Sequence, residues 1–228
     1  TPMNSSAASD VYKRQVRVLL GMIAKTAAMH DRVIKPILSL FDGHHVRVSV
    51  LIKTSKEAAS NFQEQLGYRL RTEDVPYKFI KYPSAEQIKS ASGPLWIGPL
   101  MDKEIAGRLT EECAIQTCLP AGDELKELIA KGLTWSDKDV EYSTREMIRS
   151  VKYISSAADL LSRQHLLLSL NSMPRLAGTK GAPKMDDVIS DLIESGHSAA
   201  RYPDMEPMFV TDASFDDVIS IFRKYHYD

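Results

Sequence analysis

The chain has 228 residues, a hydrophobic fraction of 43% and a formal net charge of −1. This suffices for one sizeable core or two small ones, and the balanced charge excludes a uniformly basic nucleic-acid binder. The charge is uneven, because residues 1–100 carry 14 Lys and Arg against 8 Asp and Glu, whereas residues 101–228 carry 15 against 22. A polyanion is therefore expected to meet the first part of the chain, unless its cations form only a solvated surface.

The two cysteines, Cys113 and Cys118, fit a reducing compartment and no disulfide framework. A single cysteine pair is not a zinc site, which needs about four ligands. No apolar run approaches the ~20 residues of a membrane span, and nothing near the start resembles a signal peptide. We therefore expect a cytoplasmic protein with no membrane span and no structural metal.

Residues 1–15 are small, polar and aperiodic, which indicates an adaptor sequence or a disordered segment. A helical stripe then begins at Val16, and Pro36 must end any helix that precedes it. Residues 46–53 alternate with a period of two, which predicts a half-buried strand with Arg47 and Lys53 on its wetter face. A polar corner that carries His44 and His45 separates the two elements.

A second helix is predicted over residues 56–66, capped by Thr54 or Ser55 and ended by Gly67. A strand over 68–71 follows and completes a β-α-β unit. Aromatic and basic residues then alternate, a pattern that suits a plain hairpin with one aromatic face or a surface that stacks bases and meets phosphates. These residues are Tyr77, Lys78, Phe79, Lys81 and Tyr82.

The octet GPLWIGPL at residues 93–100 predicts a short strand between two turns, with Trp96 in the core. Helices are expected over 102–113 and 123–131, followed by a longer one capped by Ser136 or Asp137. The remainder predicts a strand at 166–170, helices at 172–177, 185–195 and 215–225, and strands at 198–202 and 208–210. This order is winged-helix-like. The loop at 178–183 has the Gly, Thr and Lys of a phosphate-binding loop but not their P-loop order.

Several of these motifs together resemble the tRNA guanine-26 N2-dimethyltransferase family. The octet, followed by Asp102, is the most specific match, and Leu66-Gly67-Tyr68 also matches. Near the C-terminus, Arg201 and Thr211-Asp212-Ala213 match a family segment whose other residues differ here. The matching residues of the first segment are Arg17, Leu19, Leu20, Gly21, Ala27, Ala28, Pro36, Leu38, Ser39, His44, Arg47 and Val48.

The resemblance implies an α/β (α+β) fold. Residues 16–53 would be the end of a Rossmann-like methyltransferase domain, and residues 54–228 a mixed α+β C-terminal domain with a winged-helix-like end. It also implies S-adenosyl-L-methionine as the cofactor of the parent enzyme. The zinc-binding cysteines that family members carry near residues 73–92 are missing from this sequence.

The sequence contains neither a G-x-G-x-x-G loop nor a D-P-F or N-P-P loop, so it lacks the motifs that hold the methyl donor and aim the guanine amine. We therefore interpret it as an inactive C-terminal fragment of a tRNA N2-guanine dimethyltransferase that engages tRNA as a monomer. The alternative is a free-standing winged-helix-like nucleic-acid-binding or interaction module. No catalytic, cofactor or metal residue is assigned. The expected RNA-binding residues are Arg47, Lys53, Arg69, Arg71, Lys78, Lys81 and Arg201.

Overall fold

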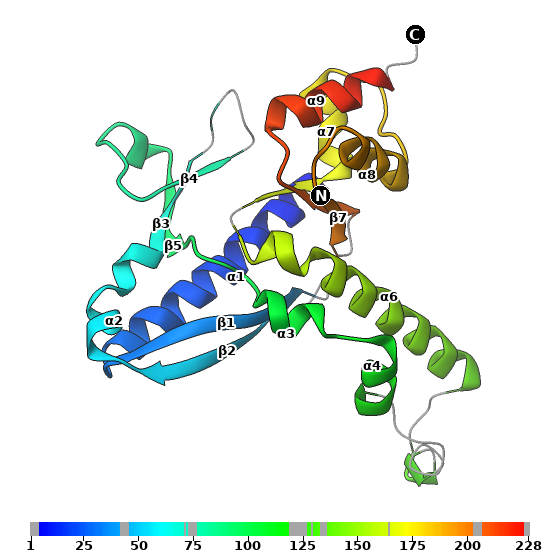
Figure 1. Cartoon of the computed structure of the whole chain (residues 1–228), viewed down its shortest axis with the longest axis horizontal. Coiled ribbons are helices and arrows are strands. Elements are labelled where there is room, and N and C mark those ends of the chain that lie inside the picture. The colour runs from blue at the N-terminus through cyan, green and yellow to red at the C-terminus, as the bar shows by residue number, and fades with distance from the viewer. Residues whose placement is uncertain are drawn as a thin grey trace.

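The computed structural model describes residues 5–41, 46–70, 72, 77–118, 127–128, 130–132, 136–163, 165–202 and 207–225. These residues form helices and three small antiparallel sheets, so the α+β fold class predicted from the sequence is confirmed. Figure 1 shows the first helix beside a two-stranded hairpin, a long helix running out from the body, and the last helices gathered on one side.

The first helix, α1, spans Ser5–Ala28 and packs against the hairpin of β1 (Arg32–Phe41) and β2 (Val46–Thr54). Val16 and Leu20 of its predicted apolar stripe are buried. The helix begins at Ser5 rather than near residue 16. Residues 5–15 contain no proline or glycine to prevent a helix, but their missing periodicity gave no signal for one.

The strand β1 was not predicted, because Pro36 lies in its middle. Pro36 is tolerated because the register of the β1–β2 pair shifts between Pro36 and Leu38, and because β1 pairs with no other strand among the described residues. The predicted strand at 46–53 is confirmed as β2. The corner with His44 and His45 lies outside the described residues.

The second sheet has the strand order β4-β3-β5, with β3 at Leu66–Leu70, β4 at Lys78–Ile80 and β5 at Ser92–Trp96. Ser55 caps α2 (Lys56–Ser60) as predicted, but this helix is short and the 3-10 turn η1 (Phe62–Gln65) follows it. Gly67 lies in β3 rather than ending a helix. A Cβ there would lie 2.8 Å from the carbonyl oxygen of Ile80, so the close pairing of β3 and β4 requires glycine.

The middle of the chain is helical. The predicted helix at 102–113 is two helices, α3 (Lys103–Gly107), which Asp102 caps, and α4 (Glu111–Cys118). The long helix α6 (Asp137–Leu161) is capped by Ser136, one of the two caps that the sequence predicted, and Asp139 completes a capping box with it. The helix expected at 123–131 falls largely outside the described residues. A 3-10 turn, η2 (Gln87–Lys89), precedes β5.

The C-terminal unit (residues 165–225) contains the third sheet, in the order β6-β8-β7. Its strands are β6 (Leu166–Ser169), β7 (Ala199–Tyr202) and β8 (Met208–Thr211), and its helical elements are η3 (Leu170–Ser172), α7 (Met173–Ala177), α8 (Met185–Glu194) and α9 (Phe215–Lys224). The sheet and the three α-helices fit the winged-helix-like arrangement expected from the sequence.

Two apolar clusters hold these layers together. The first joins α1, β5, α6 and one face of the third sheet, with Leu20, Trp96 and Val210 among its buried residues. The second lies within the C-terminal unit, where the rings of Phe209 and Phe222 stack with centroids 6.4 Å apart. Neighbouring residues of β8 are buried in different clusters, Val210 in the first and Phe209 in the second. The third sheet therefore connects the C-terminal unit to the rest of the molecule.

Candidate nucleic-acid interface

The octet GPLWIGPL is a packing element. Trp96 is 4% exposed, and its Nε1 donates a hydrogen bond to the carbonyl oxygen of Pro99 at 2.8 Å. The buried guanidinium of Arg17 donates from Nη1 to the carbonyl oxygens of Trp96 (3.0 Å) and Gly98 (3.1 Å). A Cβ on Gly98 would lie 2.8 Å from the indole ring, so this position needs glycine. The prediction that Trp96 lies in the core is confirmed.

Arg69 does not lie on an RNA-facing surface. Its side chain is 5% exposed, and its guanidinium carbon lies 4.6 Å from the ring centroid of Tyr77. Tyr77 is buried in turn, and its hydroxyl exchanges hydrogen bonds with the backbone of Leu167. The strands of the predicted β-α-β unit, β2 and β3, do not pair with one another, because they belong to different sheets.

Lys78 and Lys81 are exposed, but their surroundings differ. Lys81 Nζ forms an ion pair with Glu64 at 2.7 Å, and the hydroxyl of Tyr82 donates to the same carboxylate at 3.2 Å. The Lys81 ammonium lowers the pKa of Glu64 below its usual range. Lys78 lies on the edge strand β4, whereas Lys81 already has a protein partner that RNA would have to displace.

Arg47 and Lys53 are exposed in the structure, as the sequence predicted. Both are on the side of β2 whose residues are exposed along the strand, while Val46, Val48 and Val50 are half-buried on the other side. Arg71, the remaining cation expected on this surface, lies outside the described residues.

Arg201 on β7 is held by neighbouring elements. Its Nη2 forms an ion pair with Asp186 at 2.6 Å, and its guanidinium lies 5.7 Å from the ring centroid of Tyr153 on α6. It therefore ties α8 and α6 to the third sheet.

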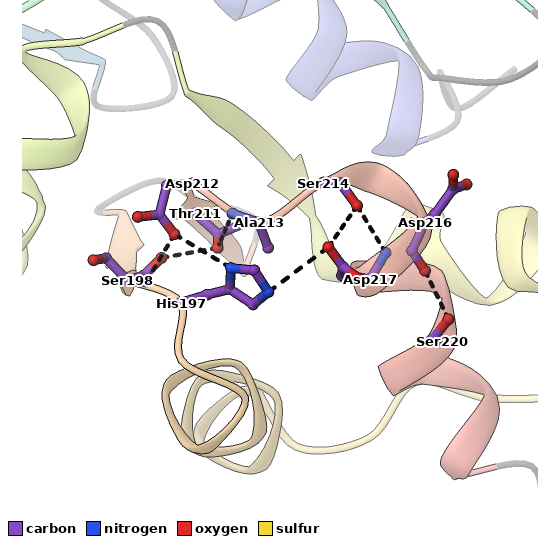
Figure 2. Close-up of polar contacts among 9 residues, drawn as sticks. All are labelled: His197, Ser198, Thr211, Asp212, Ala213, Ser214, Asp216, Asp217 and Ser220. Atoms are coloured by element: carbon purple, nitrogen blue, oxygen red, sulfur yellow. Dashed lines mark hydrogen bonds and ion pairs between the residues drawn. The ribbon is translucent and has the colours of Figure 1, made fainter.

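The Thr211-Asp212-Ala213 segment forms a junction between β7, β8 and α9 (Figure 2). The Thr211 hydroxyl donates to the carbonyl oxygen of Ser198 at 2.8 Å and accepts from the Ala213 amide at 3.1 Å. Asp212 Oδ1 accepts from the Ser198 amide at 2.8 Å. These contacts give the segment a structural role.

His197 lies between two carboxylates at the same junction (Figure 2). Its Nδ1 is 3.8 Å from Asp212 and its Nε2 is 3.7 Å from Asp217, both longer than a hydrogen bond. The Ser214 hydroxyl donates to Asp217 at 2.6 Å rather than to the imidazole. No nucleophile–base pair is formed here, so these residues do not resemble a Ser-His-Asp catalytic arrangement.

An open groove of about 860 Å³ runs beside β1, a feature that the sequence did not reveal. Its lining includes Trp96 and Phe62, and its ionisable groups are mainly acidic. Lys35, one of its cations, forms an ion pair with Asp102 and lowers the pKa of that carboxyl. An acidic groove is unfavourable for an RNA backbone.

The described residues do not fit S-adenosyl-L-methionine. Every strand pair that they form is antiparallel, whereas nucleotide-like cofactors of α/β enzymes bind at the carboxyl ends of parallel strands. Over the same residues, no group of three or more His, Cys, Asp and Glu could hold a metal ion. None of the helices that these residues form is long and apolar enough to cross a membrane.

The fold and its surface define an α+β protein with a winged-helix-like end. A family model described as N2,N2-dimethylguanosine tRNA methyltransferase matches residues 5–223, so the chain belongs to this family and the resemblance seen in its motifs is confirmed.

Relatives of the chain include tRNA (guanine(26)-N(2))-dimethyltransferases. The one from Natronomonas pharaonis is 27% identical over 217 residues, which is 89% of this chain and 50% of that protein. The one from Pyrobaculum calidifontis is 33% identical over 129 residues, which is 56% of this chain and 34% of that protein.

Among solved structures, Trm1 from Pyrococcus horikoshii, in complex with S-adenosyl-L-methionine, has a similar fold. The TM-score is 0.63 at 23% identity, over 90% of this chain and 48% of that one. The chain thus spans about half the length of the first of these relatives and of Trm1.

Proposed function

We propose that this chain is the C-terminal part of an S-adenosyl-L-methionine-dependent tRNA guanine-N2 dimethyltransferase and that it engages tRNA. The observation that carries the proposal is the family match over residues 5–223. In addition, the match to the Natronomonas relative covers only 50% of that protein. In this proposal the chain contributes RNA contacts, and the residues that transfer the methyl group belong to a separate part of the enzyme. The enzyme acts in the cytoplasm as a monomer.

Residues 16–53 would complete the methyltransferase domain. Among the described strands, β2 pairs only with β1, which leaves its other edge available for a further strand. Apolar side chains are exposed on two of the elements of this region, with Met22 of α1 62% exposed and Ile52 of β2 49% exposed. Exposed apolar groups beside an unpaired strand edge are typical of a surface that another domain covers.

The proposed RNA contacts in the first part of the chain are Arg47, Lys53 and Lys78. All three are exposed. Exposed cations bind phosphates by releasing condensed counterions, which needs no special pocket. Lys81 and Arg201 would contribute only after leaving their carboxylate partners.

Two measurements on the purified chain test the proposal. Fluorescence anisotropy with labelled tRNA should give saturable, salt-dependent binding, and calorimetry with S-adenosyl-L-methionine should give no binding heat. We expect no binding heat in the calorimetry because the antiparallel sheets of the described residues have no edge where the carboxyl ends of parallel strands meet, which is where such cofactors bind in α/β enzymes. Micromolar cofactor binding by the chain alone, or tRNA binding no tighter than that of an acidic control protein such as serum albumin at matched salt, would contradict it.

A further inference from the structure

The C-terminal unit belongs to the acidic part of the chain, yet its charges are segregated. In α9 the first turn carries Asp216 and Asp217, whereas the last turn carries Arg223 and Lys224. The helix α7, which contacts α9, carries Arg175 in its own last turn. Cations favour helix C-termini, where backbone carbonyl groups leave a partial negative charge. The C-terminal ends of α7 and α9, and the cations that they carry, therefore lie near one another.

The loop of residues 178–184 adds a further cation to this end. Arg223 Nε donates to the carbonyl oxygen of Ala177 at 3.3 Å, which joins the end of α9 to the start of the loop. The loop then folds against Tyr225, and Lys180 lines a small hollow of about 160 Å³ between them. We call Arg175, Lys180, Arg223 and Lys224 the basic end.

The side chains of the basic end are exposed, and none of them forms an ion pair with a carboxylate among the described residues. The carboxylate of Asp191 accepts a hydrogen bond from the Tyr225 hydroxyl at 3.1 Å. Lys184 is excluded from the set because Asp186 and Asp187 follow it at the start of α8. By contrast, Arg201 across the unit is paired with Asp186.

The loop can also bring backbone groups close to a ligand. The Thr179 hydroxyl donates to the carbonyl oxygen of Gly181 at 3.3 Å, which closes a tight turn. A Cβ built on Gly181 would meet open space, so the backbone at the tip of the loop is accessible. Accessible glycine backbone beside lysine is the combination that phosphate groups use in proteins.

We propose that the basic end is a second RNA-contact surface that binds the phosphate backbone of tRNA, separate from Arg47, Lys53 and Lys78 on the first part of the chain. The inference rests on the proposed function, because family membership is what favours RNA over another polyanion. The contact reads no base sequence, since lysine and arginine bind phosphates as charges. It positions the winged-helix-like unit on the tRNA.

The test compares two double charge reversals in the full chain by anisotropy over a series of salt concentrations. The first variant is Lys180→Glu with Lys224→Glu, and the matched control is Lys138→Glu with Lys152→Glu on the exposed side of α6. Both change the net charge equally. Losing two phosphate contacts should bring the log–log salt slope about 1.4 closer to zero and weaken tRNA binding about tenfold, whereas the control should keep the slope.

The outcomes separate this inference from the proposed function. If the unaltered chain binds tRNA and the Lys180/Lys224 variant keeps its slope, the basic end is not a contact surface and the proposed function remains. Equal changes in both variants would also overturn the inference, because they would reflect net charge alone. Binding of polyglutamate as tightly as tRNA would refute the assignment to RNA. If the unaltered chain does not bind tRNA, both proposals fail. Unchanged circular dichroism and thermal midpoints would show that both variants are folded.

Discussion

The region around β3 and the octet uses its cations differently from the basic end of the C-terminal unit. Around β3 and the octet, Arg17 and Arg69 are buried against aromatic rings, and Lys81 is paired with Glu64. In the C-terminal unit, Lys180 and Lys224 are exposed although the surrounding segment is acidic. Net charge along the sequence therefore does not locate the surface that a polyanion meets. The buried arginines stabilise the fold, and the exposed lysines remain available for binding.

The largest expected effect is a loss of stability when the core of the C-terminal unit is altered. Phe222 is fully buried and stacks with Phe209, so Phe222→Ala should lower the free energy of unfolding by about 4 kcal/mol. Urea denaturation gives this value. The neighbouring exposed substitution Lys224→Ala is the control and should cost less than about 0.5 kcal/mol. Similar losses for both variants would show that this unit is not built around the Phe209–Phe222 pair.

A somewhat smaller effect is expected for the buried arginine of the first part. Arg17→Ala removes two hydrogen bonds and leaves the carbonyl oxygens of Trp96 and Gly98 without that donor, so it should cost about 3 kcal/mol in the free energy of unfolding. Lys53→Ala on exposed β2 should cost less than about 0.5 kcal/mol in the same urea experiment. Equal losses of unfolding free energy for Arg17→Ala and Lys53→Ala would contradict this account, because burial would then not distinguish a cation that stabilises the fold from an exposed one.

The smallest effect concerns pH and the ion pair of Lys35 with Asp102. Hydrogen bonding to Lys35 and to the Ile105 amide lowers the pKa of Asp102, so this carboxylate stabilises the folded state above its ordinary pKa of about 4. That contribution should be lost as the pH falls through the lowered value. Unfolding of the chain and of Asp102→Asn should therefore differ at pH 7 and converge toward pH 2. A difference that stays constant with pH would refute this assignment.

The sequence predicted those parts of the fold whose signals are local. Ser55 and Ser136, each one of two expected caps, begin α2 and α6, and the alternation at residues 46–53 is strand β2. The strand β1 was missed because the bulge that accommodates Pro36 depends on pairing with β2. The wrong placement of Gly67 has a similar cause, since its conformation is set by β4 and Ile97 rather than by its neighbours in sequence.

The candidate interface was predicted less well, for a physical reason. Periodicity indicates which residues share a strand face, but only the tertiary structure shows which face another element covers. Arg47 and Lys53 remain exposed, whereas Arg69 is covered by Tyr77, the residue that directly precedes β4. The basic end was not predicted as a unit, because its cations come from α7, a loop and α9, which meet only in the folded chain.

The most direct test of the central claim is the salt dependence of tRNA binding when exposed cations of the first part are reversed. Arg47→Glu with Lys53→Glu should bring the log–log slope about 1.4 closer to zero, using about 0.7 for each lost contact. The control pair, Arg145→Glu with Arg149→Glu on α6, should leave the slope unchanged, because Arg149 is paired with Glu146 and Arg145 lies over Tyr142. Binding that does not depend on salt, or equal changes for the two pairs, would contradict the claim that exposed cations of this chain engage tRNA.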